Sequence, residues 1–159
     1  MRGKRKFILL LVFLFGLKKI EEKGENLYGE FIAKALHNTF LTSEGYLLKI
    51  NDKKILDTLN KKYLPFILIK NPEPDSTKRN SFLYPSAELL KKIKRKDVSL
   101  YLKIKFIEPQ SLHIHTKEGK DIYFGLGRFE KKIEFLSKVI DKKDSINLEL
   151  LSFLEEGGD

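Results

Sequence analysis

The residues best suited to chemistry are two histidines, His113 and His115, which stand two positions apart in the segment SLHIHTKEGKDIYFG. On a β-strand such a pair points to one face, as the ligands of a metal ion often do. A glycine-containing turn at 117–119 follows and predicts a hairpin. The two histidines therefore belong either to a metal site or to the outer face of this hairpin.

The register of the hairpin decides between these interpretations. A three-residue loop, with Gly119 in the left-handed conformation, sets Ile114 opposite Ile122 and gives the hairpin one apolar face. A two-residue loop would mix polar and apolar side chains on one face, which is disfavoured where that face is buried. The longer loop leaves the histidines on the other face, where the predicted pairs are His113 with Tyr123 and His115 with Asp121.

We therefore expect surface histidines, no metal site and no cofactor. A metal-dependent enzyme would require His37 to converge with the pair from a distant part of the chain, and nothing marks it as a ligand. The chain has no cysteine, so a thiolate zinc site is excluded. It also lacks a nucleophile elbow, a glycine-rich phosphate loop and paired carboxylates at a recognisable spacing, so no enzyme is expected.

The charge of the chain has two interpretations. Lys and Arg number 31 against 22 Asp and Glu, which gives a formal net charge of +9. Such a charge attracts nucleic acid or anionic lipid. The lysines are spread along the chain and interleaved with glutamates, however, as on the surfaces of thermophile proteins. Because no basic-aromatic motif of a nucleic-acid reader is present, nucleic acid is not an expected partner.

The N-terminus predicts a membrane anchor. Four basic residues precede an uninterrupted apolar run over 7–17. As a helix this run reaches about 17 Å, less than the ~30 Å hydrocarbon core, so flanking lysines must snorkel. No small-residue cleavage site follows, and the basic cluster predicts a cytoplasmic N-terminus with the rest exported. The expected anchor residues are Phe7, Leu10, Leu11, Phe13, Leu14 and Leu17.

Alternating hydrophobicity predicts most of the strands beyond the anchor. A ten-residue strand is expected over 98–107, with Val98, Leu100 and Leu102 on its core face and Tyr101 on the mostly solvated face. Glu108 and Pro109 end this strand before the hairpin of the histidines. The turn sequence T-x-E-G also occurs at 42–45 and predicts a second hairpin, 39–42 with 46–50. A buried strand over 64–70 and a last strand over 145–151 are expected, whereas 30–36 fits a strand or a short helix.

Helices and a loop separate these strands. Asp52 is expected to cap a helix ended by Pro65, and Pro85 to begin another helix with an apolar stripe. The clearest amphipathic helix covers 129–141, and 71–81 is a polar loop. These elements predict an α+β fold with a largely antiparallel sheet of hairpins and two or three packed helices, preceded by a short hydrophobic N-terminal helix.

Taken together, segments 100–140 and 145–151 resemble the C-terminal β-domain of the bacterial division proteins FtsQ/DivIB. That family has a strand, a hairpin with glycine in its turn, a glycine that opens an amphipathic helix, and a closing strand. The segments FLTSEGYLLK and LPFI are similar to upstream parts of the same domain. Residues 18–29 are too few for the POTRA domain that such proteins carry after the anchor, so this domain is expected to be missing or reduced to a degenerate remnant within 18–70. The implied divisions are 1–19 for the N-terminus and anchor, 20–29 for a linker, 30–153 for the β-domain and 154–159 for a polar tail.

The resemblance implies a non-enzymatic scaffold of the division septum, held in the cytoplasmic membrane by a single span with its C-terminal domain outside the cytoplasm. Its implied partners are FtsB- and FtsL-like proteins, with no small-molecule substrate. An exposed sheet edge is suited to such binding by strand addition. The implied contact residues are Asn147, Leu148, Glu149, Leu150, Leu151 and Phe153.

An alternative hypothesis is a basic exported or membrane-peripheral module that binds anionic polymer or lipid. It predicts that lysines gather on one face of the folded domain and that binding is strongly salt-dependent. The residues concerned are Lys91, Lys92, Lys94, Arg95 and Lys96.

Overall fold

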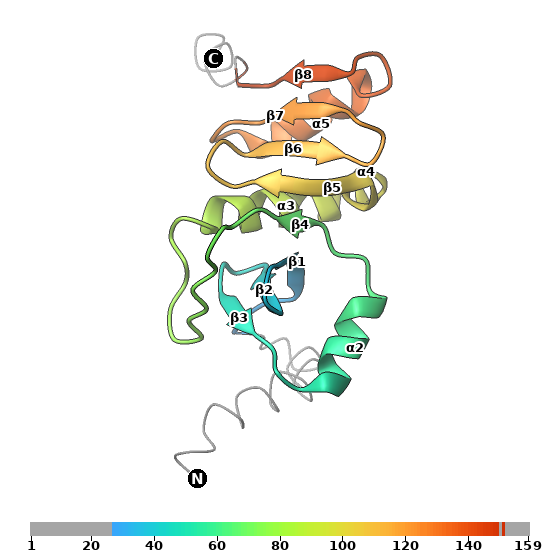
Figure 1. Cartoon of the computed structure of the whole chain (residues 1–159). Helices are drawn as coiled ribbons and strands as arrows, with labels where there is room; N and C mark the ends of the chain where they lie inside the picture. The colour runs from blue at the N-terminus through green and yellow to red at the C-terminus, as the bar shows by residue number, and fades with distance from the viewer. Residues whose placement is uncertain (1–26, 150, 152–159) are drawn as a thin grey trace.

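The structure is a computed structural model that describes residues 27–149 and residue 151 (Figure 1). The expected anchor at 1–19 and the tail at 154–159 lie outside these residues. The strands are β1 (Phe31–Ala35), β2 (Thr39–Thr42), β3 (Leu47–Lys49), β4 (Phe66–Ile67), β5 (Ile104–Glu108), β6 (His113–Thr116), β7 (Asp121–Tyr123) and β8 (Ser145–Asn147). The helices are α2 (Lys53–Lys61), α3 (Tyr84–Lys96), α4 (Val98–Lys103) and α5 (Phe129–Val139). None of the helices in the described part is long and apolar enough to cross a bilayer.

All eight described strands form one sheet in the order β3-β2-β1-β4-β5-β6-β7-β8 (Figure 1). Four neighbouring pairs are antiparallel, and the pairs β1–β4, β4–β5 and β7–β8 are parallel. The parallel pairs are connected through helices, as parallel strands require. The predicted α+β class with a mostly antiparallel sheet is therefore confirmed, with four helices in the described part where two or three were expected.

The two halves of the sheet are covered differently. Along β1, Phe31 packs in a core with α2, whereas Ile32 packs in the larger core that includes residues of α3, α4 and α5. In the strands β5, β6 and β7, residues such as Ile114 and Ile122 enter only the larger core. The opposite face of these three strands carries aromatic, histidine and carboxylate side chains, and none of them enters either core.

Several local predictions are confirmed. Both predicted hairpins form, and that of the histidines has the predicted register, with Ile114 opposite Ile122. The Asp52 carboxylate accepts hydrogen bonds from two N–H groups at the start of α2. Pro85 lies in the first turn of α3, and the segment that fitted either strand or helix is the strand β1.

The predicted strand over 98–107 is wrong in its first half, which is the helix α4. The Asp97 carboxylate accepts a hydrogen bond from the Leu100 N–H and begins this helix. The Tyr101 side chain, expected in solvent, is buried and donates its hydroxyl to the Ile32 carbonyl at 2.8 Å. Val98 and Leu102, expected in the core, are exposed. The alternation of apolar with other residues in this segment is thus also consistent with a short helix, which here buries the adjacent residues Leu100 and Tyr101.

Two predicted strands are shorter than expected. In the segment 64–70 the strand comprises only Phe66 and Ile67. In the segment 145–151 the strand ends at Asn147, whose side-chain carbonyl accepts a hydrogen bond from the Glu149 N–H. This bond turns the chain after three paired residues, so the expected contact strand does not extend to Leu151.

Candidate functional site

Strand β8 is the last strand of the sheet and pairs only with β7 among the described residues. The Asp144 carbonyl accepts from the Asp121 N–H, and the Leu148 N–H donates to the Tyr123 carbonyl. Because backbone groups alternate in direction along a strand, the N–H and C=O groups of Ser145 and Asn147 point away from β7. Both residues are exposed, so they form an open edge.

The structure separates the residues that the sequence placed together as a contact strand. Asn147 lies on the open edge, but the Leu148 side chain is fully buried in the core. Glu149 is exposed in the turn, and the Leu151 N–H donates to the Leu148 carbonyl. The side chain of Leu150, and Phe153, lie outside the described residues.

The other edge of the sheet is bridged. Strand β3 has the loop 71–81 on its outer side, where the Asp75 N–H donates to the Leu47 carbonyl at 2.9 Å. The Asn80 N–H also donates to the Gly45 carbonyl at 2.8 Å. Bridging of this kind is how proteins protect sheet edges from further pairing. β8 is thus the more accessible edge of the described sheet.

A buried lysine fixes the chain beside β8. Lys132 of α5 is fully buried, and its Nζ donates to the carbonyls of Phe124 at 2.7 Å and Leu126 at 3.2 Å. Burial lowers the pKa of Lys132, while the nearby Glu149 carboxylate acts in the opposite direction. The sequence did not mark Lys132, although it lies three residues after Phe129 on the apolar stripe of its helix.

A hollow of about 400 Å³ lies next to the end of β8. Its lining includes Glu149, the partly exposed Phe82 and Leu126, and the buried Leu112. Glu149 joins this hollow to the segment that follows β8, and the rest of the lining comes from loops of neighbouring elements and from the first turn of α3.

The two predicted histidines form a compact cluster on the face of β5, β6 and β7 that lies opposite the larger core. His113 stacks on Tyr123 with ring centroids 3.9 Å apart, and His115 stacks on Phe106 at 4.1 Å. The histidine rings lie 4.0 Å from each other. The predicted face is correct, but His113 is buried by its neighbours and not a surface residue.

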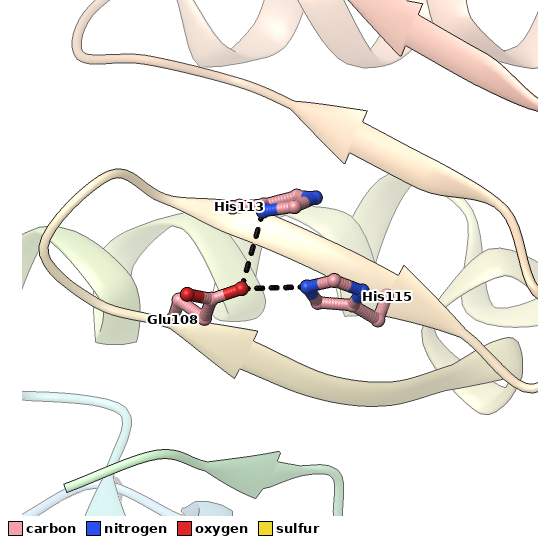
Figure 2. A group of neighbouring side chains, drawn as sticks. All are labelled: Glu108, His113 and His115. Carbon is pink, nitrogen blue, oxygen red and sulfur yellow. Dashed lines mark hydrogen bonds and ion pairs between the residues drawn. The ribbon is translucent and has the colours of Figure 1, made fainter.

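Two carboxylates lie on opposite sides of these rings. Glu108 Oε2 lies 3.2 Å from His113 Nδ1 and 2.6 Å from His115 Nε2 (Figure 2). Asp121 Oδ1 lies 3.3 Å from His113 Nε2 and 2.8 Å from His115 Nδ1. Each of the four ring nitrogens therefore has a carboxylate oxygen within 3.3 Å, and the hydrogen bonds are those of His113 Nε2 with Asp121 and of His115 Nε2 with Glu108.

Glu108 was predicted only to end a strand, and its place beside the histidines was not predicted. Its position opposite His113 follows from the pairing of β5 with β6, which the alternating pattern on both sides of 109–112 could have indicated. His37, in contrast, is exposed on the turn between β1 and β2, outside the group of possible metal ligands in the described residues.

Comparisons of the chain with protein-family models, curated proteins and solved structures found no match.

Proposed function

We propose that this protein is a non-enzymatic, membrane-anchored scaffold of the bacterial division machinery that binds a partner by strand addition at β8. The observation that carries the proposal is the open edge of β8, where the backbone groups of Ser145 and Asn147 point away from the sheet. An extended partner segment can satisfy these groups with main-chain hydrogen bonds. The contact strand is then 145–147 and is shorter than the sequence implied.

The division role and the identity of the partners come from the resemblance to FtsQ/DivIB. In this proposal the partners are FtsB- and FtsL-like proteins. The N-terminal apolar segment holds the chain in the cytoplasmic membrane, with the sheet on the extracytoplasmic side. The sheet topology supports this proposal in one respect, because the closing segment of the resemblance is the outermost strand.

The alternative, a module that binds anionic polymer or lipid, has less support. Four lysines of α3 form ion pairs with glutamates of other elements, which lowers the positive potential of that helix. The shortest pairs are Lys91 with Glu44 at 2.9 Å and Lys94 with Glu30 at 3.0 Å. The remaining two pairs are Lys92 with Glu130 and Lys96 with Glu134.

The test is capture of an FtsB/FtsL pair from the same bacterium by the full-length protein in detergent. Proline in place of Ser145 removes an outward N–H and leaves the bonds to β7 intact, because proline is tolerated at the first residue of an edge strand. We expect Ser145→Pro to reduce capture at least tenfold and the matched control Ser145→Ala, which keeps the N–H, to capture normally.

Proline at Leu148 is a poor test of strand addition, since it would break a hydrogen bond to β7 and disturb a buried position.

Capture of the partner should persist at high salt, because main-chain hydrogen bonds carry the binding. Capture that salt abolishes would favour the alternative module. Equal capture by Ser145→Pro and wild type, with unchanged melting, would contradict strand addition at β8.

A further inference from the structure

We propose that Glu108, His113 and His115 bind a divalent transition-metal ion of the zinc type. One ligand atom from each of these side chains lies within 4.8 Å of the other two. Two imidazoles and one carboxylate are a common ligand set for zinc sites that keep positions open for water. The inference differs from the expectation drawn from the sequence and is independent of the proposed scaffold function.

The first argument is a count of protons. A neutral imidazole carries one N–H, so the two histidines supply two donors. Four ring nitrogens nevertheless face carboxylate oxygens at 2.6 to 3.3 Å. When both N–H groups lie on Nε2, they form the hydrogen bonds of His113 with Asp121 Oδ1 and of His115 with Glu108 Oε2. Each Nδ1 then carries a lone pair 3.2 Å or 2.8 Å from a carboxylate oxygen, a close contact that a bound cation would relieve.

The second argument concerns which nitrogens carry the lone pairs. Metal binding requires the tautomer of His115 with its N–H on Nδ1, which lies 2.8 Å from Asp121 Oδ1, and that of His113 with its N–H on Nε2, which bonds to the same oxygen. The lone pairs are then on His113 Nδ1 and His115 Nε2, the two ring atoms that lie next to Glu108 Oε2 (Figure 2). In metal sites, the ring nitrogen of a ligand histidine that does not bind the metal commonly donates its N–H to a carboxylate. Asp121 is thus a positioning residue that orients both rings.

The third argument is that the ligands are held in place before an ion binds. His113 is fixed between Tyr123 and the other histidine, and His115 stacks on Phe106. Two ligands of a tetrahedral zinc ion lie roughly 3.3 Å apart. His113 Nδ1 and Glu108 Oε2 are already 3.2 Å apart. The half-exposed Glu108 needs only a small outward shift to accommodate the ion beside His115.

The chemistry of the ligands also predicts which ions bind. Imidazole favours Zn²⁺, Co²⁺, Ni²⁺ and Cu²⁺, whereas Mg²⁺ and Ca²⁺ favour oxygen ligands. With three protein ligands and a partly exposed carboxylate, the remaining coordination positions are left to water. We expect selective binding of the first group of ions, with Mg²⁺ and Ca²⁺ unable to compete at similar concentrations.

The test is isothermal titration of Zn²⁺ into the full-length protein, purified in detergent without a histidine tag and stripped of metal. We expect one ion per chain and a rise in melting temperature on binding. Co²⁺ should give an absorption band from bound metal that Zn²⁺ removes. Glu108→Gln and His115→Asn should each weaken Zn²⁺ binding at least tenfold, and Asp121→Asn should weaken it by about 10- to 100-fold.

His37→Asn is the matched control, because it removes the exposed histidine outside the cluster and should leave binding unchanged. Melting of each metal-free variant shows whether it is folded. If a histidine variant does not fold, the Glu108→Gln variant still tests the site, because Glu108 is half-exposed. Absence of saturable binding, or equal binding by wild type and the folded Glu108→Gln variant, would overturn the inference.

Discussion

The two T-x-E-G turns of this protein use the same residues and hydrogen bonds in different surroundings. In each turn the threonine N–H donates to the carbonyl of the residue after glycine, and the glycine N–H donates to the threonine carbonyl. The threonine Oγ1 accepts from the N–H of the residue after glycine, at 3.1 Å in the first turn and 2.9 Å in the second. The turn is therefore a local structure that does not depend on the rest of the fold.

The difference lies in what surrounds each turn. Gly45 packs against Tyr84 of α3 and accepts a hydrogen bond from Asn80. Around Gly119, a Cβ atom would have no neighbour within 4 Å. The comparison shows that one local turn serves both as a buried contact with a helix and as an exposed tip. Substitutions should therefore have equal effects where the turns agree and unequal effects where they differ.

The largest difference is expected for the glycines. Both have a positive φ, +91° for Gly45 and +89° for Gly119, which alanine adopts at a cost of about 1 to 2 kcal/mol. At position 45 the added Cβ would also lie 2.7 Å from Tyr84 Cδ1. Overpacking adds about 1 to 3 kcal/mol. Urea unfolding should therefore show a clearly larger loss for Gly45→Ala than for Gly119→Ala, and equal losses would contradict the difference in packing.

A smaller and equal effect is expected for the threonines. Thr42→Val and Thr116→Val each remove the hydroxyl that accepts a backbone N–H, at a cost of about 1 kcal/mol in the free energy of unfolding. Both side chains are buried, so valine keeps their volume and apolar contacts. The same unfolding measurement should give losses within about 0.5 kcal/mol of each other. A much larger loss at one position would show that the turns are not equivalent.

The smallest effect is expected for the glutamates. Glu44 forms ion pairs with Arg79 at 3.4 Å and Lys91 at 2.9 Å, whereas Glu118 forms none with the described residues. Partly exposed ion pairs contribute about 0 to 1 kcal/mol and are screened by salt. Glu44→Gln should thus lower stability slightly at low salt and less at high salt. Glu118→Gln should leave the unfolding midpoint unchanged in both conditions.

The features that the sequence predicted correctly are those that nearby residues determine. The register at Ile114 and Ile122 follows from a turn sequence and an alternating pattern within a dozen residues. The cap at Asp52 is equally local. The helix α4 was missed because Val98, Leu100 and Leu102 alternate with other residues and continue the pattern of β5, whereas the residues that the helix buries are the adjacent Leu100 and Tyr101. Here the position of Asp97 was a better guide than the periodicity.

The candidate sites depend on relations across the sheet, and the sequence revealed them only in part. Both histidines were identified, but Glu108 reaches them from β5, a pairing that had not been inferred. The edge position of β8 depends on strand order, which no local pattern determines. The length of β8 depends on the side chain of Asn147, which accepts a backbone bond and turns the chain.

The bridge between Asp75 and β3 also determines how many molecules can assemble through the sheet. The described sheet of each chain offers one open edge for pairing, so its valence for strand addition is one. Two copies that paired through β8 would present only bridged β3 edges to the outside. Such self-association stops at a dimer and does not continue into a fibre, since open-ended growth requires two free edges on every subunit.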